Sequence, residues 1–329
     1  MPLKTYGVLR GTVVDHQLAT TANAHFQLHV VDDAGKHFRI AVNVESDVAP
    51  SELEYLIDSA FAHPILPEVA ALPSGWTALA REPGGVALDF IRANLFKRED
   101  LRKLPFDVPG PDNDLNEKLA HYVRRAIADA GATVFAFGER WPTEANVKDK
   151  VFGFLPGNGV HDIHMNQSNV GRFVADDGVW QDGALLLHFP AQDQWVAVFL
   201  KFQSQTWHTD DATGHKIAGP GEAPDGRIRI VGALVNAIET PEVEFVTLLN
   251  TTAEDVDLAG WSLADRDKHT MALDGTIGAG ETLRIRLTPQ VTLPNRGGVL
   301  SVLDAAGLKV DGVAYTGEQA AEPGRTVAF

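Results

Sequence analysis

The sequence predicts a two-domain α+β protein, with a β-rich N-terminal domain that contains a few helices and a C-terminal all-β domain. A chain of 329 residues is too long for one small core. Alternating apolar patterns typical of strands recur through the first two hundred residues. Later in the chain, short strands recur at intervals of about 8–12 residues, as in a β-sandwich. We therefore predict a domain over 1–211 that carries the site, a Gly- and Pro-rich linker over 212–226, and a sandwich over 227–329.

Composition excludes several classes of function. The chain contains no cysteine, which removes disulfide frameworks, thiolate nucleophiles and zinc–thiolate clusters. Its formal net charge is -16 and no basic run occurs, and this charge disfavours nucleic acid as a partner. The N-terminus shows no signal-peptide pattern, and no apolar stretch of about 18 residues could span a bilayer. We expect a cytoplasmic protein without a transmembrane segment.

The N-terminal elements follow from alternation along the chain. Residues 5–15 read as a strand, and residues 24–31 and 36–44 as a hairpin around the turn at 32–35. One face of this hairpin is apolar. The opposite face carries His25, Gln27, His29, His37, Arg39 and Asn43. Two interpretations stay open: a wet outer face of a small barrel, or a cleft lined by His25, His29 and Asn43.

The next elements include helices and buried strands. Ser51 and Glu54 form a plausible capping box, so we predict a helix beginning at 50–54. An amphipathic pattern predicts a second helix over 115–130, ended by Gly131. Strands are expected over 133–138, 183–189 and 195–202, and the last two are apolar on both faces, as in a sheet interior.

Residues 159–169 concentrate polar side chains that could form a site. Read as a strand, this stretch points Ile163 and Met165 to one side and Asp162, His164 and Asn166 to the other. A second polar run, 203–211, directly follows a buried strand, which is where ligand groups are commonly placed. We therefore predict a site built from 159–169, 203–210 and the N-terminal hairpin.

Two resemblances concern different parts of the chain. The Leu258-Ala259-Gly260-Trp261-Ser262-Leu263 step and its surroundings make residues 227–329 resemble a lamin-tail domain. That resemblance implies an immunoglobulin-like sandwich and a protein partner bound through it. Residues 1–210 resemble the YukJ-like family of uncharacterised bacterial proteins at 161–167, at Asp182-Gly183, and at Phe202 to Gln205 with Trp207. This second resemblance implies no established activity.

The first functional hypothesis is a hydrolase, specifically a phosphodiesterase. The order of helix, buried strand and His-bearing strand has a faint likeness to half of a phospholipase D-type enzyme, although the lysine two positions after the histidine is missing. In such a site one histidine attacks phosphorus and another protonates the leaving group. The predicted catalytic residues are His161, His164, Asn166 and Asp162. The predicted ligand-binding residues are His25, His29, Arg39, Asn43, Gln167, Asn169, Gln203, Gln205, Trp207 and Asp210.

Three alternatives stay open. His161 and His164 with Asp162 or Asp210 allow a divalent metal site without indicating it strongly, so no cofactor is assigned. The same polar groups could instead form a structural network that ties loops to the sheet. The third alternative is a non-enzymatic binding protein, whose polar pocket holds a small molecule while the C-terminal domain mediates interactions. The sequence does not predict the oligomeric state.

Overall fold

The structure is a computed structural model that describes residues 6–20, 25–44, 53–79, 94–97, 100–103, 114–161, 183–202 and 226–329. The chain forms two compact units. The first contains residues 1–61, 67–88 and 98–206, and the second contains residues 62–66, 89–97 and 207–329. The predicted linker at 212–226 lies outside the described residues except for its last position, so it stays a prediction.

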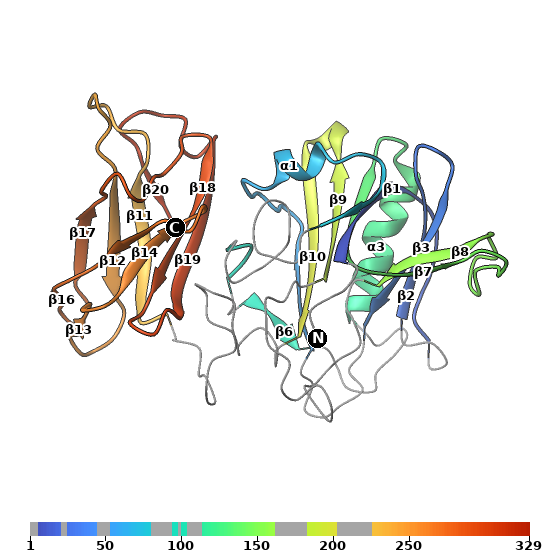
Figure 1. Cartoon of the computed structure of the whole chain (residues 1–329), viewed down its shortest axis with the longest axis horizontal. Helices are drawn as coiled ribbons and strands as arrows, with labels where there is room; N and C mark the ends of the chain where they lie inside the picture. The colour runs from blue at the N-terminus through green and yellow to red at the C-terminus, as the bar shows by residue number, and fades with distance from the viewer. Residues whose placement is uncertain are drawn as a thin grey trace. The chain divides into compact units, whose positions relative to one another are not determined.

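The elements up to residue 202 are mostly strands (Figure 1). In chain order they are β1 Tyr6–Gln17, β2 His25–Val31, β3 His37–Asn43, β4 Leu53–Asp58, α1 Leu66–Ala70, β5 Gly75–Ala78, β6 Arg102–Lys103, α3 Asp114–Ala128, β7 Thr133–Glu144, β8 Gly157–His161, β9 Gly183–Phe189, the 3-10 turn Pro190–Gln192, and β10 Gln194–Phe202. The strands predicted near 5–15, 24–31, 36–44, 133–138, 183–189 and 195–202 and the helix predicted over 115–130 are confirmed.

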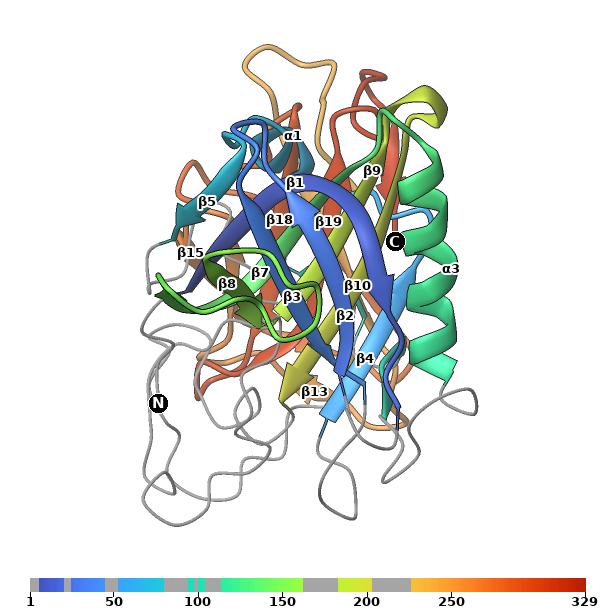
Figure 2. The same cartoon turned by 90° about the vertical axis from the view of Figure 1, so that its right-hand side faces the viewer.

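Five of these strands close into a ring. The sheet runs β5-β1-β2-β3-β8-β7-β9-β10-β4-β6, and an additional pairing joins β1 to β7. The ring order is therefore β1-β2-β3-β8-β7 and back to β1. The β3–β8 pair is parallel, and the other pairs of the ring are antiparallel. In Figure 2, β1 arches across this ring, because its first half pairs with β7 and its second half with β2.

The alternation of apolar and polar residues, together with one glycine, explains why these strands close into a ring. The predicted apolar face of the hairpin is buried, with Phe26, Leu28, Phe38 and Ile40 at most 1% exposed. At Gly11 the β1 strand passes from β7 to β2, and a Cβ there would lie 2.6 Å from the Val30 side chain. Glycine therefore permits the close approach of the two strands.

The rest of the first unit extends the ring as an open sheet. The N-terminal half of β7 also pairs with β9, and β10 joins β9 to β4. Helix α3 contributes Leu115, Leu119 and Val123 to the core that the ring strands share with β9 and β10. Its buried Asn116 side chain bonds the backbone N–H and carbonyl of Ala19, which fixes the helix to the chain after β1.

The helix predicted to begin at 50–54 is wrong at its described residues. Residues Leu53–Asp58 form strand β4, which pairs with β10 from Ala197↔Asp58 to Phe202↔Leu53. The capping-box pattern is local, whereas pairing with a buried apolar strand satisfies every second backbone group of the segment. Tertiary pairing therefore overrides the local helix signal.

The second unit contains two four-stranded antiparallel sheets and one two-stranded sheet. Their orders are β17-β12-β11-β20, β15-β14-β18-β19 and β13-β16. The bounds are β11 Ile228–Leu234, β12 Phe245–Asn250, β13 Val256–Asp257, β14 Ser262–Asp265, β15 Thr270–Ala272, β16 Thr276–Ile277, β17 Thr282–Arg286, β18 Gly297–Leu303, β19 Lys309–Thr316 and β20 Thr326–Ala328. The expectation of a β-rich protein is thus met.

Residues from both four-stranded sheets share one core around Trp261, which is 4% exposed. A turn of charged residues at 265–269 joins β14 to β15. Asp265 is buried there and accepts hydrogen bonds from the backbone N–H groups of Asp267 and His269. This carboxylate therefore shapes the turn and is not a free surface charge.

Glu244, beside β12, gives this unit a predicted pH dependence. Its half-buried carboxylate accepts the Leu293 N–H at 3.1 Å. Burial raises the pKa of Glu244 to about 7, with a smaller contribution from Glu242 that the hydrogen bond partly opposes. Because the folded-state pKa is the higher one, the folded state is favoured below the unfolded value and loses stability as pH rises through about 7.

We therefore expect Glu244→Gln to stabilise the protein at pH 8 and to have little effect at pH 4.5. After a discount for solvent screening, the gain at pH 8 should be about 1–2 kcal/mol. Thermal unfolding at both pH values measures it, and replacement of exposed Glu318 by glutamine is the control. An equal effect of Glu244→Gln at both pH values would contradict the assignment.

Candidate functional site

The polar face of the β2–β3 hairpin is largely covered. Gln27, Arg39 and Asn43 are 2%, 8% and 4% exposed. The loop at 145–156, between β7 and β8, contacts this face through a hydrogen bond to Arg39 and through ring contacts with His29. Figure 2 shows the same loop in green beside β2 and β3. The interpretation of a wet outer face is therefore wrong for these three residues.

Arg39 is the central charge of this face. Its Nε donates to Asp149 Oδ2 at 2.7 Å, and its Nη1 donates to Gln27 Oε1 at 2.7 Å. The guanidinium also lies 4.6 Å from the centre of the Trp141 ring. These contacts leave Arg39 satisfied under the loop, as a buried cation requires.

Asp149 bonds both the Arg39 guanidinium and the backbone of the loop. Its Oδ1 accepts the backbone N–H groups of Val151 at 3.0 Å and Phe152 at 2.8 Å. Burial alone would raise the pKa of Asp149, but these bonds and Arg39 outweigh burial and hold the pKa below its ordinary value. The carboxylate therefore stays ionised and holds the turn at 149–154 against β3.

Four rings are gathered where the loop meets the hairpin, and we call them the ring platform: His29, His37, Phe152 and Phe154. The His29 ring stacks on Phe152 and Phe154 with centroid distances of 5.0 and 5.1 Å. The His37 ring stacks on Phe154 at 5.7 Å. His37 is exposed and the other three rings are half-exposed. Flat, partly exposed rings of this kind can stack against planar or ring-shaped ligands.

The two histidines of the platform form one hydrogen-bonded pair. His29 Nε2 and His37 Nδ1 are 2.8 Å apart, so one ring donates and the other must be neutral to accept. Burial, and then the neighbouring His37, lower the pKa of His29, while Asp15 and Asp149 oppose the shift. Each ring retains one further nitrogen, outside this bond, that can donate or accept a hydrogen bond.

The structure brings some predicted site residues together and leaves others outside its described part. His25, His29, Arg39 and Asn43 all lie on the β2–β3 hairpin, with His25 paired to Asn43 and His29 to Arg39. The backbone of His161 lies in β8, paired with Ala41. The remaining predicted residues lie outside the described residues: Asp162, His164, Asn166, Gln167, Asn169, Gln203, Gln205, Trp207 and Asp210. Their predicted catalytic and binding roles stay predictions.

Sequence analysis missed the residues that complete this face. The missed residues are Trp141 in β7 and Asp149, Phe152 and Phe154 in the loop after it. In the sequence, the mixed charges of this loop are typical of an ordinary solvent-exposed surface. One signal was available: two phenylalanines separated by a glycine, in a loop with no helical or strand period. Rings in such a segment either pack on the fold or contact a ligand, and here they contact the hairpin histidines.

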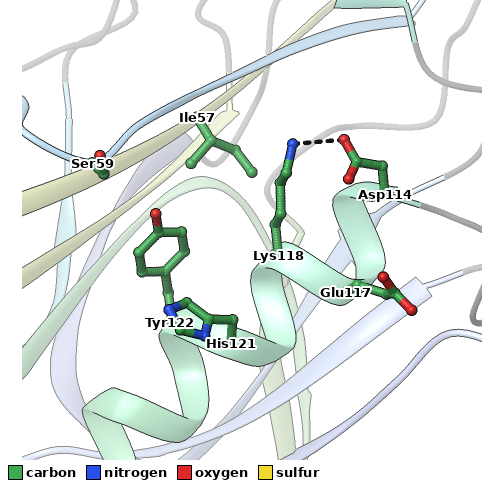
Figure 3. Close-up of a pocket in the computed structure, with 7 residues that line it drawn as sticks. All are labelled: Ile57, Ser59, Asp114, Glu117, Lys118, His121 and Tyr122. Atoms are coloured by element: carbon green, nitrogen blue, oxygen red, sulfur yellow. Dashed lines mark hydrogen bonds and ion pairs between the residues drawn. The ribbon is translucent and has the colours of Figure 1, made fainter.

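A separate pocket of about 400 Å³ lies beside α3 (Figure 3). Its lining residues are Ile57, Ser59, Asp114, Glu117, Lys118, His121 and Tyr122. Lys118 donates to Asp114 at 2.6 Å, and Tyr55 donates to the same oxygen at 3.3 Å. The lysine charge is therefore already matched within the pocket, which contains none of the predicted site residues.

Two features are absent from the described part of the chain. Within it, no group of three or more histidine, aspartate or glutamate side chains could hold a metal ion. The described helices include none that is long and apolar enough to cross a membrane.

The ring of five strands in the first unit has the topology of an OB-fold, a five-stranded Greek-key barrel. In chain order the strands of the ring are β1, β2, β3, β7 and β8. The third and fifth of these, β3 and β8, pair in parallel, and helix α3 lies between the third and fourth in the sequence. OB-folds bind ligands on the outer face of strands 2 and 3, beside the loop between strands 4 and 5. In this chain those positions are the β2–β3 face and the loop 145–156, where the ring platform lies.

Comparison with known proteins shows the family. Residues 1–214 match the uncharacterized conserved protein family DUF2278, and the chain belongs to that family. It is 40% identical to the uncharacterized protein YukJ of Bacillus subtilis (strain 168) over 214 residues, which are 64% of this chain and 93% of that protein. The resemblance seen over residues 1–210 is thereby confirmed at the level of the family.

Proposed function

We propose that this chain is a ligand-binding protein and that its ligand stacks on the ring platform. The observation that carries the proposal is the position of the four rings on the face that OB-folds use for ligands. Fold alone does not define function, so the local chemistry matters more. It consists of partly exposed rings, two histidine nitrogens open to hydrogen bonding, and a loop held in place by Asp149.

Exposed apolar side chains on the same loop support a binding role. Val147 is 53% exposed and Leu155 is 58% exposed, and both flank the residues that form the platform. Large exposed apolar side chains beside stacked rings favour a surface that is covered when a partner binds. In OB-folds, ligands commonly lie between this loop and the strands.

Binding is favoured over hydrolysis by the state of the described histidines. His29 and His37 are hydrogen-bonded to each other, so neither has a described partner that would activate it as a nucleophile. The phosphodiesterase hypothesis depends on His161 and His164, whose side chains the structure does not describe. It therefore stays a prediction, testable with bis-p-nitrophenyl phosphate and the variants His161→Ala and His164→Ala.

The binding proposal predicts that Phe154→Ala weakens ligand binding. Loss of one stacking ring should cost about 1–3 kcal/mol, or roughly 5- to 150-fold in Kd. Probes are an array of uncharged oligosaccharides and single-stranded (dT)12, followed by calorimetry on each probe that binds. At least one probe should bind the wild type and lose affinity in Phe154→Ala.

Tyr122→Ala is the matched control, because it removes a half-exposed ring from the separate pocket beside α3. It should leave the affinity unchanged, and circular dichroism should show that both variants are folded. Failure of every probe to bind, or equal loss in the two variants, would contradict the proposal.

For the C-terminal unit we keep the immunoglobulin-like, lamin-tail-like assignment as a proposal, with a protein partner as its ligand. Two four-stranded antiparallel sheets around Trp261 support it. Pull-down with residues 227–329 alone would be unsuitable, because residues 62–66 and 89–97 group with this unit. The full chain is the correct bait.

A further inference from the structure

We infer that the ligand of the ring platform is an uncharged oligosaccharide and not a single-stranded nucleic acid. This inference rests on the proposed function and deepens it. OB-folds bind both ligand classes on this face. Both classes can lie flat on aromatic rings, but only nucleic acid brings one negative charge with each unit. The charges around the platform therefore discriminate between them.

The guanidinium on this face is not available to a phosphate. Arg39 is 8% exposed, and its nitrogens bond Asp149 and Gln27. A phosphate would have to displace the Asp149 carboxylate, which also holds the loop through two backbone N–H groups. Displacement would release the loop that supplies Phe152 and Phe154, and so it would dismantle the stacking surface.

The exposed part of the platform offers neutral hydrogen bonding. A histidine pair joined at 2.8 Å contains at least one neutral ring, and when both rings are neutral its two outer nitrogens offer one donor and one acceptor. Sugar hydroxyl groups both donate and accept, so they match such a pair. Their C–H faces can lie on Phe152 and Phe154 while the hydroxyls reach the imidazoles.

Long-range charge favours the same ligand class. The net charge of -16 repels a polyanion. Lys148 and Lys150 are exposed on the loop and Lys36 is exposed next to His37, and a phosphate backbone would use these cations. Asp15 lies close enough to His29 to influence its titration, and it would repel the same backbone. Lys36, Lys148 and Lys150 beside Asp15 do not make the continuous basic groove that single strands require.

The test compares the best oligosaccharide from an array of uncharged glycans with (dT)12, by calorimetry at about 50 and 200 mM salt. We expect the oligosaccharide to bind with a Kd that changes less than about twofold between these salt concentrations, because no counterions are released. Phe154→Ala should weaken it by the roughly 5- to 150-fold expected for loss of one stacking ring. The double variant Lys148→Gln, Lys150→Gln should bind it as the wild type does.

Two outcomes overturn the inference. In the first, no uncharged oligosaccharide binds. In the second, (dT)12 binds more tightly than any sugar and loses affinity with salt and in the lysine variant. If (dT)12 binding depends on Phe154, the ring platform is still a binding site and only the ligand class is wrong. If no probe depends on Phe154, the proposed function fails as well.

Discussion

Arg39→Met is expected to lower the free energy of unfolding of the N-terminal unit by about 3–5 kcal/mol, since it leaves a buried carboxylate without its cation. The Arg39 and Asp149 side chains are 9% and 2% exposed, and their charged atoms are 2.7 Å apart. Without the guanidinium, the Asp149 charge would be stabilised by backbone N–H groups alone. Urea unfolding of the full chain, followed by tryptophan fluorescence, measures the loss.

Lys118→Met provides the matched control. The Lys118–Asp114 pair is slightly shorter, at 2.6 Å, but its side chains are 38% and 56% exposed. Exposed pairs within one helix contribute only about 0.3–0.5 kcal/mol. A similar cost for the two methionine variants would show that burial does not decide the strength of the Arg39 pair.

A double variant separates the pair from its surroundings. Removing both charges with Arg39→Met and Asp149→Asn should cost less than the sum of the two single changes, because neither partner is then left alone. The same pair also predicts that the stability of the folded state decreases at acid pH. Since the Asp149 pKa is lowered in the folded state, its contribution is present above the unfolded value and is lost as pH falls through the folded one.

The barrel was predictable from the sequence as a set of strands but not as a ring. Alternation correctly assigned Phe26, Leu28, Phe38 and Ile40 to the core. Closure depends on β1 pairing with both β2 and β7, which are more than one hundred residues apart. No local pattern in the sequence indicates such a pairing. Gly11, where β1 changes partner, cannot be distinguished in the sequence from the other glycines among the 30 of the chain.

The site was predictable only on its hairpin side. A period of two placed His25, His29, Arg39 and Asn43 on one face, and they lie there. The covering loop could not be predicted, because the Arg39–Asp149 bond joins residues 110 positions apart. Burial of the face follows from that contact and not from hairpin periodicity. The polar residues that looked most like a wet surface are therefore among the most buried.

The Pro-rich stretch at 62–112 contains a residue on which the C-terminal unit depends. Asn94 is 5% exposed, and its φ of 50° lies in the left-handed region that asparagine tolerates. Its Nδ2 lies within hydrogen-bonding distance of Leu300 O, Val313 O and Ser301 Oγ, at 2.9–3.1 Å. Its Oδ1 accepts from Lys309 Nζ at 3.1 Å. One side chain thus satisfies groups on both β18 and β19.

Gly312 in β19 leaves the space that this amide fills, because a Cβ there would collide with the Asn94 side chain. We therefore expect Gly312→Ala to destabilise the C-terminal unit by about 3 kcal/mol, since it displaces Asn94 and breaks its buried hydrogen bonds. Asn94→Gly should cost a similar amount, because it removes the same hydrogen bonds while keeping the backbone conformation.

The double variant decides whether the two residues act as one unit. Once Asn94→Gly has emptied the space, adding Gly312→Ala should cost little more, so the two losses should be far from additive. Thermal unfolding of the four proteins of this cycle measures the coupling. Additive losses would mean that the alanine at 312 acts through the β19 backbone and that Asn94 is not what Gly312 accommodates. Strong coupling would make the segment at 94–97 an integral part of the C-terminal unit, although about 130 residues separate it from the first strand of that unit.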